Sequence, residues 1–203
     1  MGHQAKNNEV YNRHAHAFKT TFDNNGARTY DIELAIRLAG NPPAAHVVEI
    51  GCGTGRDAAE IIKRVAWYEG FDPAENMVNV AQTHVPQARF VVADAVSYAY
   101  PPNLDVVFAF ASLLHVDHKD MPMVFQKVAQ ALRPGGIFCV RLREKDEYSE
   151  EIQTDEFGDR LYFHYNPKLL QEYAGNRFSI MHVDRDIDAK RDITWFGVAF
   201  KKN

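Results

Sequence analysis

The residue types best suited to chemistry in this chain begin at a glycine-rich turn. Gly51, Gly53 and Gly55 follow a short apolar run, residues 46–50, and precede a segment with helical spacing that starts at Asp57. Glycine tolerates positive φ and lets a ligand approach the bare backbone. A helix beginning here would present free N–H groups and a partial positive charge. The pattern predicts a strand–turn–helix unit that holds a nucleotide-type cofactor; a tight turn without a ligand is the alternative.

Asp72 is the second candidate, because it ends the next apolar run, residues 67–71, and stands 21 positions after Gly51. A carboxylate at the end of a neighbouring parallel strand can accept hydrogen bonds from both hydroxyls of an adenosine ribose. An aspartate before Pro73 could equally cap a turn if it stood alone. Together with the glycine turn, the position favours a ribose contact.

The glycine spacing separates two cofactor classes. Dinucleotide-binding folds use G-x-G-x-x-G, and this chain has Arg56 where the third glycine would stand. Its own spacing is G-x-G-x-G, with Glu49 two residues before the first glycine. The pattern therefore argues against a nicotinamide-dependent oxidoreductase.

Alternating strands and helices must position these residues. The predicted strands are 46–50, 67–71, 89–92, 104–110, 137–142, 178–183 and 194–200, and the predicted helices are 8–21, 29–38, 57–66, 74–83, 121–132 and 168–174. This alternation predicts a doubly wound α/β fold with right-handed crossovers. Ligands of such folds bind beyond the carboxyl ends of the strands, where the glycine turn and Asp72 both fall.

Composition limits the classes of protein. The chain has 203 residues, 46% of them apolar, and a formal net charge of −4, which suits one globular domain without a dominant basic surface. Cys52 and Cys139 have neither metal nor disulfide spacing, so no metal is predicted. We find no apolar leader and no run of about 18 apolar residues, and we expect a cytoplasmic protein without a membrane span.

Five ordered segments resemble the motifs of the class I S-adenosylmethionine-dependent methyltransferases. They are Glu49–Gly55, Phe71–Met77, Phe90–Ala95, Leu104–Val116 and Leu132–Gly136. In the second, Ala74 replaces the serine that is common in the family, so one hydroxyl contact is absent. The matches run from Val47 to Gly136 and cover most of the predicted core. They do not indicate the substrate class.

The resemblance implies a Rossmann-like, mostly parallel seven-stranded sheet with its last strand antiparallel and helices on both faces. It implies S-adenosyl-L-methionine as cofactor and S-adenosyl-L-homocysteine as product. The implied cofactor contacts are Tyr11, Glu49, Gly51, Cys52, Gly53, Gly55, Asp72, Pro73, Met77, Asp94, Ala95, Ala111 and Ser112. Asp72 would hold the ribose, Asp94 the adenine amino group, and Ala111 would lie near the sulfonium. We expect one domain, residues 1–203, with a helical cap (1–43), a cofactor-binding core (44–142) and an acceptor side (143–203).

Methyl transfer needs a general base only when the nucleophile must lose a proton. His115, after the fourth strand, is the candidate base, and a packed structural histidine is the alternative. Arg141, His164 and Tyr165 are the candidate substrate contacts. Residues 162–165 are expected on a loop, or otherwise on an edge strand. Tyr11 and Phe18 could close over the cofactor or simply pack.

An acidic run, residues 144–156, contains seven carboxylates and one lysine and is expected to form an exposed loop or flap. It would repel a phosphate backbone approaching the acceptor side. Arg141 and Arg143 could pair with this run or meet an acidic substrate. The sequence thus predicts methyl transfer to an O or N atom of a small molecule, with nucleic acid unlikely as a partner. An RNA or protein methyltransferase and a non-catalytic nucleoside-binding module are the alternatives. The oligomeric state is not predicted.

Overall fold

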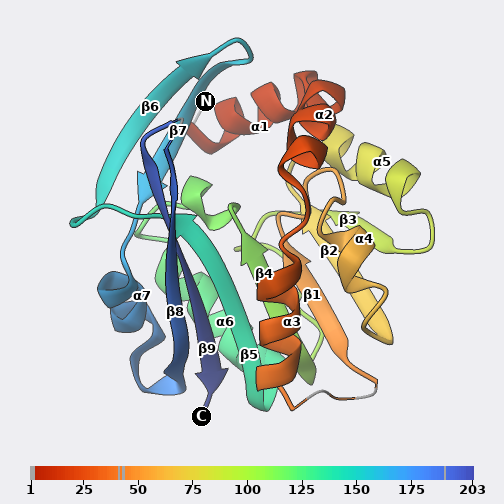
Figure 1. Cartoon of the computed structure of the whole chain (residues 1–203), viewed down its shortest axis with the longest axis vertical. Coiled ribbons are helices and arrows are strands. Elements are labelled where there is room, and N and C mark those ends of the chain that lie inside the picture. Colours follow the sequence, from red (N-terminus) through yellow and green to blue (C-terminus); the bar gives the residue numbers. More distant parts are fainter. Residues whose placement is uncertain (1–2, 41, 43, 190) are drawn as a thin grey trace.

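A seven-stranded sheet forms the centre of the molecule, with helices on both faces (Figure 1). The computed structural model describes residues 3–40, 42, 44–189 and 191–203. The strands are β1 (His46–Ile50), β2 (Trp67–Asp72), β3 (Arg89–Val92), β4 (Leu104–Phe110), β5 (Leu132–Arg143), β8 (Phe178–Asp188) and β9 (Ile193–Lys202). Their order in the sheet is β3-β2-β1-β4-β5-β9-β8.

The strand directions confirm the predicted fold class. β1 to β5 are parallel neighbours, and β9, the last strand, is antiparallel to both β5 and β8. The order reverses between β1 and β4, which is where ligands of doubly wound sheets bind. The glycine turn follows β1 and Asp72 ends β2, so the chain brings both to this point.

Alternating side chains of the central strands build two core layers. Val106 and Phe108 of β4 lie in the layer with α3 (Thr29–Leu38) and α4 (Ala58–Ile61). Val107 and Ala109 lie in the layer with α6 (Met121–Ala131) and α7 (Pro167–Ala174). All seven residues of β4 are buried, as the continuous apolar run predicts for a central parallel strand.

Two predicted helices differ from the structure. The predicted helix 8–21 is divided at His14 into α1 (His3–Arg13) and α2 (Ala15–Asn25). No glycine or proline marks this break; it falls where Asn12 accepts two hydrogen bonds from Asn76, at the start of α5 (Glu75–His84). The predicted helix 57–66 is reduced to the single turn of α4.

The acidic run does not form the predicted loop. It contributes β6 (Ser149–Asp155), which pairs antiparallel with β7 (Gly158–His164) in a separate two-stranded sheet. Glu151 and Gln153 are half-buried, whereas Glu150, Ile152 and Thr154 are exposed. This is the alternation of a strand, but it cannot be recognised in the acidic sequence. Tyr162 and His164 therefore do not lie on a loop. They belong to a strand, which was the alternative prediction.

The two N-terminal helices lie across one end of the sheet, near β6 and β7 on one side and α5 on the other (Figure 1). Asn7 of α1 pairs with both backbone groups of Leu161 in β7, at 2.8 and 2.9 Å. This end of the molecule is therefore covered by segments from both ends of the chain. Within the described ranges, no helix is long and apolar enough to cross a membrane.

Candidate active site

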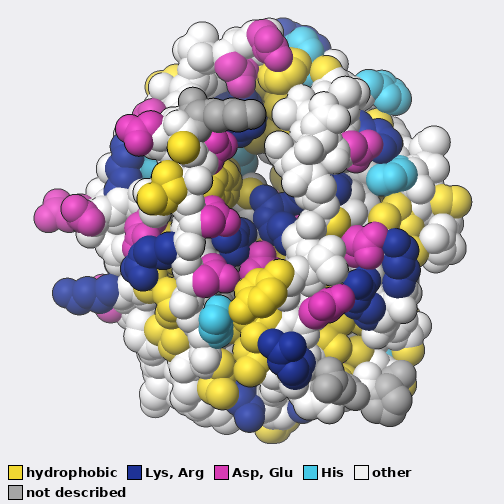
Figure 2. Space-filling view, viewed as in Figure 1, with side chains coloured by type: hydrophobic (Ala, Val, Ile, Leu, Met, Phe, Trp, Pro, Cys, Tyr) yellow, Lys and Arg dark blue, Asp and Glu magenta, His cyan; other side chains and the backbone are white. Residues whose placement is uncertain are grey.

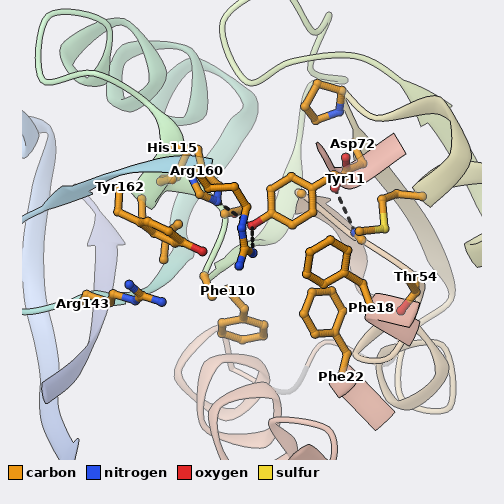
Figure 3. Close-up of a pocket in the computed structure, with 18 of the residues that line it drawn as sticks. Tyr11, Phe18, Phe22, Thr54, Asp72, Phe110, His115, Arg143, Arg160 and Tyr162 are labelled. Atoms are coloured by element: carbon orange, nitrogen blue, oxygen red, sulfur yellow. Dashed lines mark hydrogen bonds between the residues drawn. The ribbon is translucent and has the colours of Figure 1, made fainter. Parts of the chain in front are cut away.

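A cavity of about 790 Å³ opens at the carboxyl ends of the parallel strands, beneath α1, α2 and the β6–β7 hairpin. Figure 2 shows the molecule hollowed at this position, with basic side chains visible inside the hollow. Figure 3 shows two sides of the cavity, one with Asp72, Thr54, Phe18 and Phe22, the other with His115, Arg143, Arg160 and Tyr162.

The glycine turn has the backbone geometry that the sequence predicts. Gly51 has φ of +69°, and a Cβ built there would lie 2.2 Å from Cβ of Ser112. The N–H groups of Gly51 and Cys52 both donate to the Phe71 carbonyl, at 2.8 and 3.0 Å, which fixes the turn against β2. Only glycine satisfies both the positive φ and the close approach at position 51.

Asp72 links the glycine turn to the segment that follows β2. Its Oδ2 accepts from the Gly53 N–H at 3.1 Å, and its Oδ1 accepts from the Ala74 N–H at 2.9 Å. Burial raises the pKa of Asp72 to about 6, although both backbone bonds lower it. The carboxylate lines the cavity, where a ligand hydroxyl could donate to its remaining lone pairs.

Glu49 and Asp57 place buried carboxylates beneath the turn. The Tyr68 hydroxyl donates to Glu49 at 2.5 Å, and burial, together with the nearby charge of Asp57, raises the pKa of Glu49. Asp57 accepts from the side chains of Arg28, at 3.0 Å, and Arg56. Arg56, which stands where a dinucleotide motif would have glycine, is therefore held by an ion pair inside the turn.

The strand end after β4 forms the floor of the cavity. Ala111 has φ of +54°, which is uncommon for a residue with a side chain and is found where surroundings enforce strain, often at functional sites. The Ser112 hydroxyl donates to the Ile50 carbonyl at 2.6 Å and so joins this segment to β1. Both residues line the cavity, as predicted.

Asp94 also lines the cavity, but its carboxylate already has local partners. Oδ1 accepts from the N–H groups of Val96 and Ser97, and Oδ2 accepts from the Ser97 hydroxyl at 2.5 Å. Burial would raise the pKa of Asp94, but these bonds lower it. The side chain shapes the turn after β3, beside Ala95 on the cavity wall.

His115 lies in a hydrogen-bonded network with both ring nitrogens engaged. Nδ1 is 2.8 Å from the Leu161 carbonyl, which can only accept, so this nitrogen carries the proton. Asn7 Nδ2, 3.0 Å from the same nitrogen, donates to that same carbonyl. Nε2 then accepts from the Tyr11 hydroxyl at 2.8 Å, and Arg160 donates to the same hydroxyl at 3.3 Å. Burial lowers the pKa of His115 to about 3, and the positive charges of Arg160 and Arg143 act in the same direction. The hydrogen bond to Leu161 acts in the opposite direction but is outweighed.

Four predicted site residues do not line the cavity. Gly55, with φ of +81°, packs its backbone against Ala81 of α5. Tyr165 lies in the core, where its hydroxyl donates to the Val116 carbonyl at 2.5 Å. His164 is buried beside Ser149 and Glu151. Arg141 is held by Asp31, Asp184 and Asp186. The other predicted contacts, Tyr11, Glu49, Gly51, Cys52, Gly53, Asp72, Pro73, Met77, Asp94, Ala95, Ala111, Ser112 and His115, all line it.

Several cavity residues could not be assigned from the sequence. Phe22 stacks on Phe18, with ring centroids 5.6 Å apart, and Tyr11 lies 4.9 Å from Phe18. Arg160 and Trp195 enter from β7 and β9, far along the chain from the motifs. The one available signal was the helical spacing of Tyr11, Phe18 and Phe22, which a continuous helix would place on a common face.

The cluster around Arg141 gives a prediction about stability. Burial raises the pKa of Asp31 to about 6 despite the adjacent Arg141, so an ionised Asp31 depends on that guanidinium. Arg141→Met should destabilise the fold by about 1–2 kcal/mol, or about 2–8 °C in Tm, because charged hydrogen bonds are lost. The loss is no greater because Asp186 is exposed, so its ion pair with Arg141 contributes little.

The loss of folding stability in Arg141→Met should be greater at pH 8 than at pH 5. At pH 5 Asp31 takes up a proton, which the folded state binds more tightly than the unfolded one. Thermal unfolding at both pH values measures the difference. Equal losses at the two pH values would show that the pairing of Arg141 with ionised Asp31 contributes nothing to stability.

The fold and the cavity define an α/β domain with a candidate ligand site at the switch point of its sheet. A family model described as "Methyltransferase domain" matches residues 47–136. Trans-aconitate 2-methyltransferase of Acidovorax sp. (strain JS42) is 30% identical over 128 residues, covering 61% of this chain and 48% of that protein. The enzyme of the same name from Delftia acidovorans is 34% identical over 106 residues, covering 49% and 38%.

Solved structures agree on the fold. Burkholderia thailandensis 1,6-didemethyltoxoflavin-N1-methyltransferase, solved with 1,6-didemethyltoxoflavin and S-adenosylhomocysteine bound, aligns with a TM-score of 0.73 at 19% identity, covering 97% of this chain and 87% of that one. An S-adenosylmethionine-dependent methyltransferase from Clostridium acetobutylicum gives 0.73 at 15% identity, covering 95% and 99%. The chain thus matches a methyltransferase domain over residues 47–136 and shares the fold of these solved methyltransferases. It spans about half the length or less of the curated relatives described above.

Proposed function

We propose that this protein transfers a methyl group from S-adenosyl-L-methionine to a small molecule. The observation that carries the proposal is the pairing of the Asp72 carboxylate with the Gly53 N–H, at 3.1 Å, on the wall of a cavity at the switch point of the sheet. This arrangement offers a nucleoside both a carboxylate for ribose hydroxyls and exposed backbone of the glycine turn.

The residues that line the cavity fit this cofactor. A buried Thr54 hydroxyl beside the turn has no hydrogen-bond partner among the described residues, so a ligand group could satisfy it. Tyr11, Phe18 and Phe22 place aromatic rings on the same side of the cavity as Asp72 (Figure 3). Aromatic faces attract a cation, and the sulfonium of the cofactor is one.

When bound, S-adenosyl-L-methionine would supply an activated methyl group for an acceptor lone pair and would leave as S-adenosyl-L-homocysteine. The chain's own contribution is to bind and align both partners and to exclude water. Asp72 and the glycine turn hold one partner, and the α1–α2 pair and the β6–β7 hairpin cover the cavity. We propose that residues 1–43 act as the cap and 143–203 as the acceptor side.

His115 serves best as a positioning residue in this proposal. Its proton-accepting Nε2 already binds the Tyr11 hydroxyl, and a pKa of about 3 makes it a weak base. An acceptor that needs no deprotonation suits such a site, and a carboxylate oxygen is one. The curated relatives carry the name trans-aconitate 2-methyltransferase, so trans-aconitate is the first acceptor to assay.

A thermal-shift titration tests cofactor binding. S-adenosylhomocysteine at 100 times its Kd should stabilise the fold by about 2.7 kcal/mol and raise Tm by several degrees, whereas NAD should leave Tm unchanged. The glycine spacing is the reason for the difference, since Arg56 occupies the place of the third dinucleotide glycine. A shift with NAD and none with S-adenosylhomocysteine would contradict the proposal.

A further inference from the structure

Arg143, at the end of β5, is a buried cation that faces the cavity without an anionic partner. The residue is only 7% exposed and lines the cavity wall. Nη1 donates to the side-chain oxygen of Gln153 at 2.8 Å, whereas Nε is buried and has no hydrogen-bond partner among the described residues. Burial lowers the pKa of Arg143, in keeping with a cation whose charge is poorly compensated.

The surroundings of Arg143 supply a neutral oxygen and two aromatic rings. Gln153 Nε2 donates to Glu151 at 2.9 Å, which turns the amide oxygen of Gln153 toward the guanidinium. Glu151 itself pairs with Lys145 at 3.0 Å. The guanidinium lies over the Tyr162 ring, 4.0 Å from its centroid, and 5.5 Å from the Trp195 ring. These contacts fix its position but do not neutralise its charge.

The other arginines that line the cavity each have a carboxylate. Arg28 and Arg56 share Asp57, and Arg160 pairs with Asp155. Arg191 lies 3.5 Å from Asp188. Within residues 3–40, 42, 44–189 and 191–203, Arg143 is thus the cavity arginine that has no carboxylate within ion-pair distance. A buried charge is costly unless it is paired, so a ligand that brings the missing anion would bind strongly here.

The position of Arg143 separates it from the cofactor side. Figure 3 shows it across the cavity from Asp72 and Thr54, on the same side as Tyr162 and Arg160. The Tyr11 hydroxyl, which His115 and Arg160 both contact, lies between the two sides. An anion at Arg143 would therefore belong to the second molecule in the cavity, the methyl acceptor.

We propose that Arg143 is the residue that selects the acceptor, by binding a carboxylate that the acceptor carries. This inference rests on the proposed function, because it assigns a part of the same cavity to the second substrate. A guanidinium is planar, always charged at physiological pH and suited in shape to a carboxylate. Stacking on Tyr162 fixes the guanidinium before the ligand binds, so little side-chain entropy remains to be lost on binding.

Calorimetric titration of the protein saturated with S-adenosylhomocysteine tests the proposal. The probes are acids with one, two and three carboxylates, including trans-aconitate, each compared with its uncharged methyl ester. The wild type should bind at least one acid and not its ester. Arg143→Met should weaken that binding by about 10- to 100-fold, the loss of one charged hydrogen-bonding group. Arg143→Lys keeps the charge but not the planar fork, so its affinity for the acid should lie between those of the wild type and Arg143→Met.

A matched control is Arg185→Met, which removes an arginine of β8 that pairs with Glu144 at 2.6 Å and does not line the cavity. Both control and test variants should bind S-adenosylhomocysteine as the wild type does. A wild type that does not bind S-adenosylhomocysteine would contradict the proposed function itself. A wild type that binds this compound but none of the acids, or an Arg143→Met variant that binds acid as well as the wild type, would overturn the role of Arg143.

Stability in the absence of ligands gives a second readout. Arg143→Met removes an unpaired buried charge and keeps an apolar side chain of similar reach, so its Tm should equal or exceed that of the wild type. The acid that binds should raise Tm of the wild type and not that of the variant. A fall of several degrees in the variant without ligand would show that Arg143 acts in folding, and would overturn the proposal.

Discussion

Asp72→Ala should weaken S-adenosylhomocysteine binding by about 100-fold, because two charged hydrogen bonds to a ribose are worth about 3 kcal/mol together. The carboxylate is half-buried on the cavity wall and already oriented by the N–H groups of Gly53 and Ala74. Isothermal titration calorimetry measures the change. The variant should keep its far-ultraviolet circular dichroism spectrum, since the pairing of β2 with β1 and β3 is made by backbone groups.

Asp105→Ala is the matched control for Asp72. Asp105 also accepts from a backbone N–H, that of His46 at 2.8 Å, and pairs with Arg133 at 2.7 Å, but it does not line the cavity. Its loss should lower Tm and leave cofactor affinity unchanged. An Asp72→Ala variant with undiminished affinity would show that Asp72 only shapes its turn.

The pH dependence of binding should identify the same group. With a pKa of about 6, Asp72 is increasingly protonated below that value and then loses its capacity to accept from both ribose hydroxyls. Affinity of the wild type should therefore be constant above about pH 7 and decline as pH falls below 6, by up to about ten-fold per pH unit. The decline attributable to this group should be absent in Asp72→Ala.

Gly51→Ala should destabilise the fold by about 2–5 kcal/mol, combining left-handed backbone strain with overpacking. The new Cβ would lie 2.2 Å from Cβ of Ser112, a distance that forces the two strand ends apart. Gly53→Ala is the comparison: φ is +53° there, but the nearest atom to a new Cβ is in the Phe22 ring, 3.6 Å away. That variant should lose only about 1–2 kcal/mol, the strain alone. Urea unfolding measures both.

The double variant Gly51→Ala, Ser112→Gly separates the two causes. Ser112→Gly removes the clashing Cβ but also the hydroxyl bond to the Ile50 carbonyl, so the reference is the Ser112→Gly single variant. In that background Gly51→Ala should cost only the backbone strain. If Gly51→Ala costs as much stability in the Ser112→Gly background as in the wild type, then φ at position 51, and not the close approach of β1 and β4, requires glycine.

The order of the motifs predicted the sheet well, and it brought the glycine turn and Asp72 to one cavity, because these features depend on local patterns. Gly51 and Asp72 belong to strand ends that the apolar runs define, and parallel strands bring such ends together. The β6–β7 hairpin was missed because its first strand is mostly polar and buries little apolar surface. The break at His14 was missed because a contact with α5, and no local signal, ends the helix there.

The contacts on the side of the cavity with His115 and Arg143 could not be predicted for a different reason. His115 meets Tyr11 and Leu161, which are 104 and 46 positions away, and such contacts leave no trace in spacing. Arg141 and Arg143 are indistinguishable as sequence, yet only Arg143 lines the cavity, while Arg141 is held by aspartates of α3 and β8. Tertiary structure decides which of two neighbouring arginines is available to a ligand.

Methyl transfer from S-adenosylmethionine labelled on its methyl group tests the central claim most directly. The protein would be incubated with labelled cofactor and a cell extract or purified acids, and the products separated by a size cut-off filter. The account predicts label in the small-molecule fraction, dependent on Asp72 and insensitive to ribonuclease. Label confined to RNA or protein, or no transfer by a protein that binds S-adenosylhomocysteine, would contradict it.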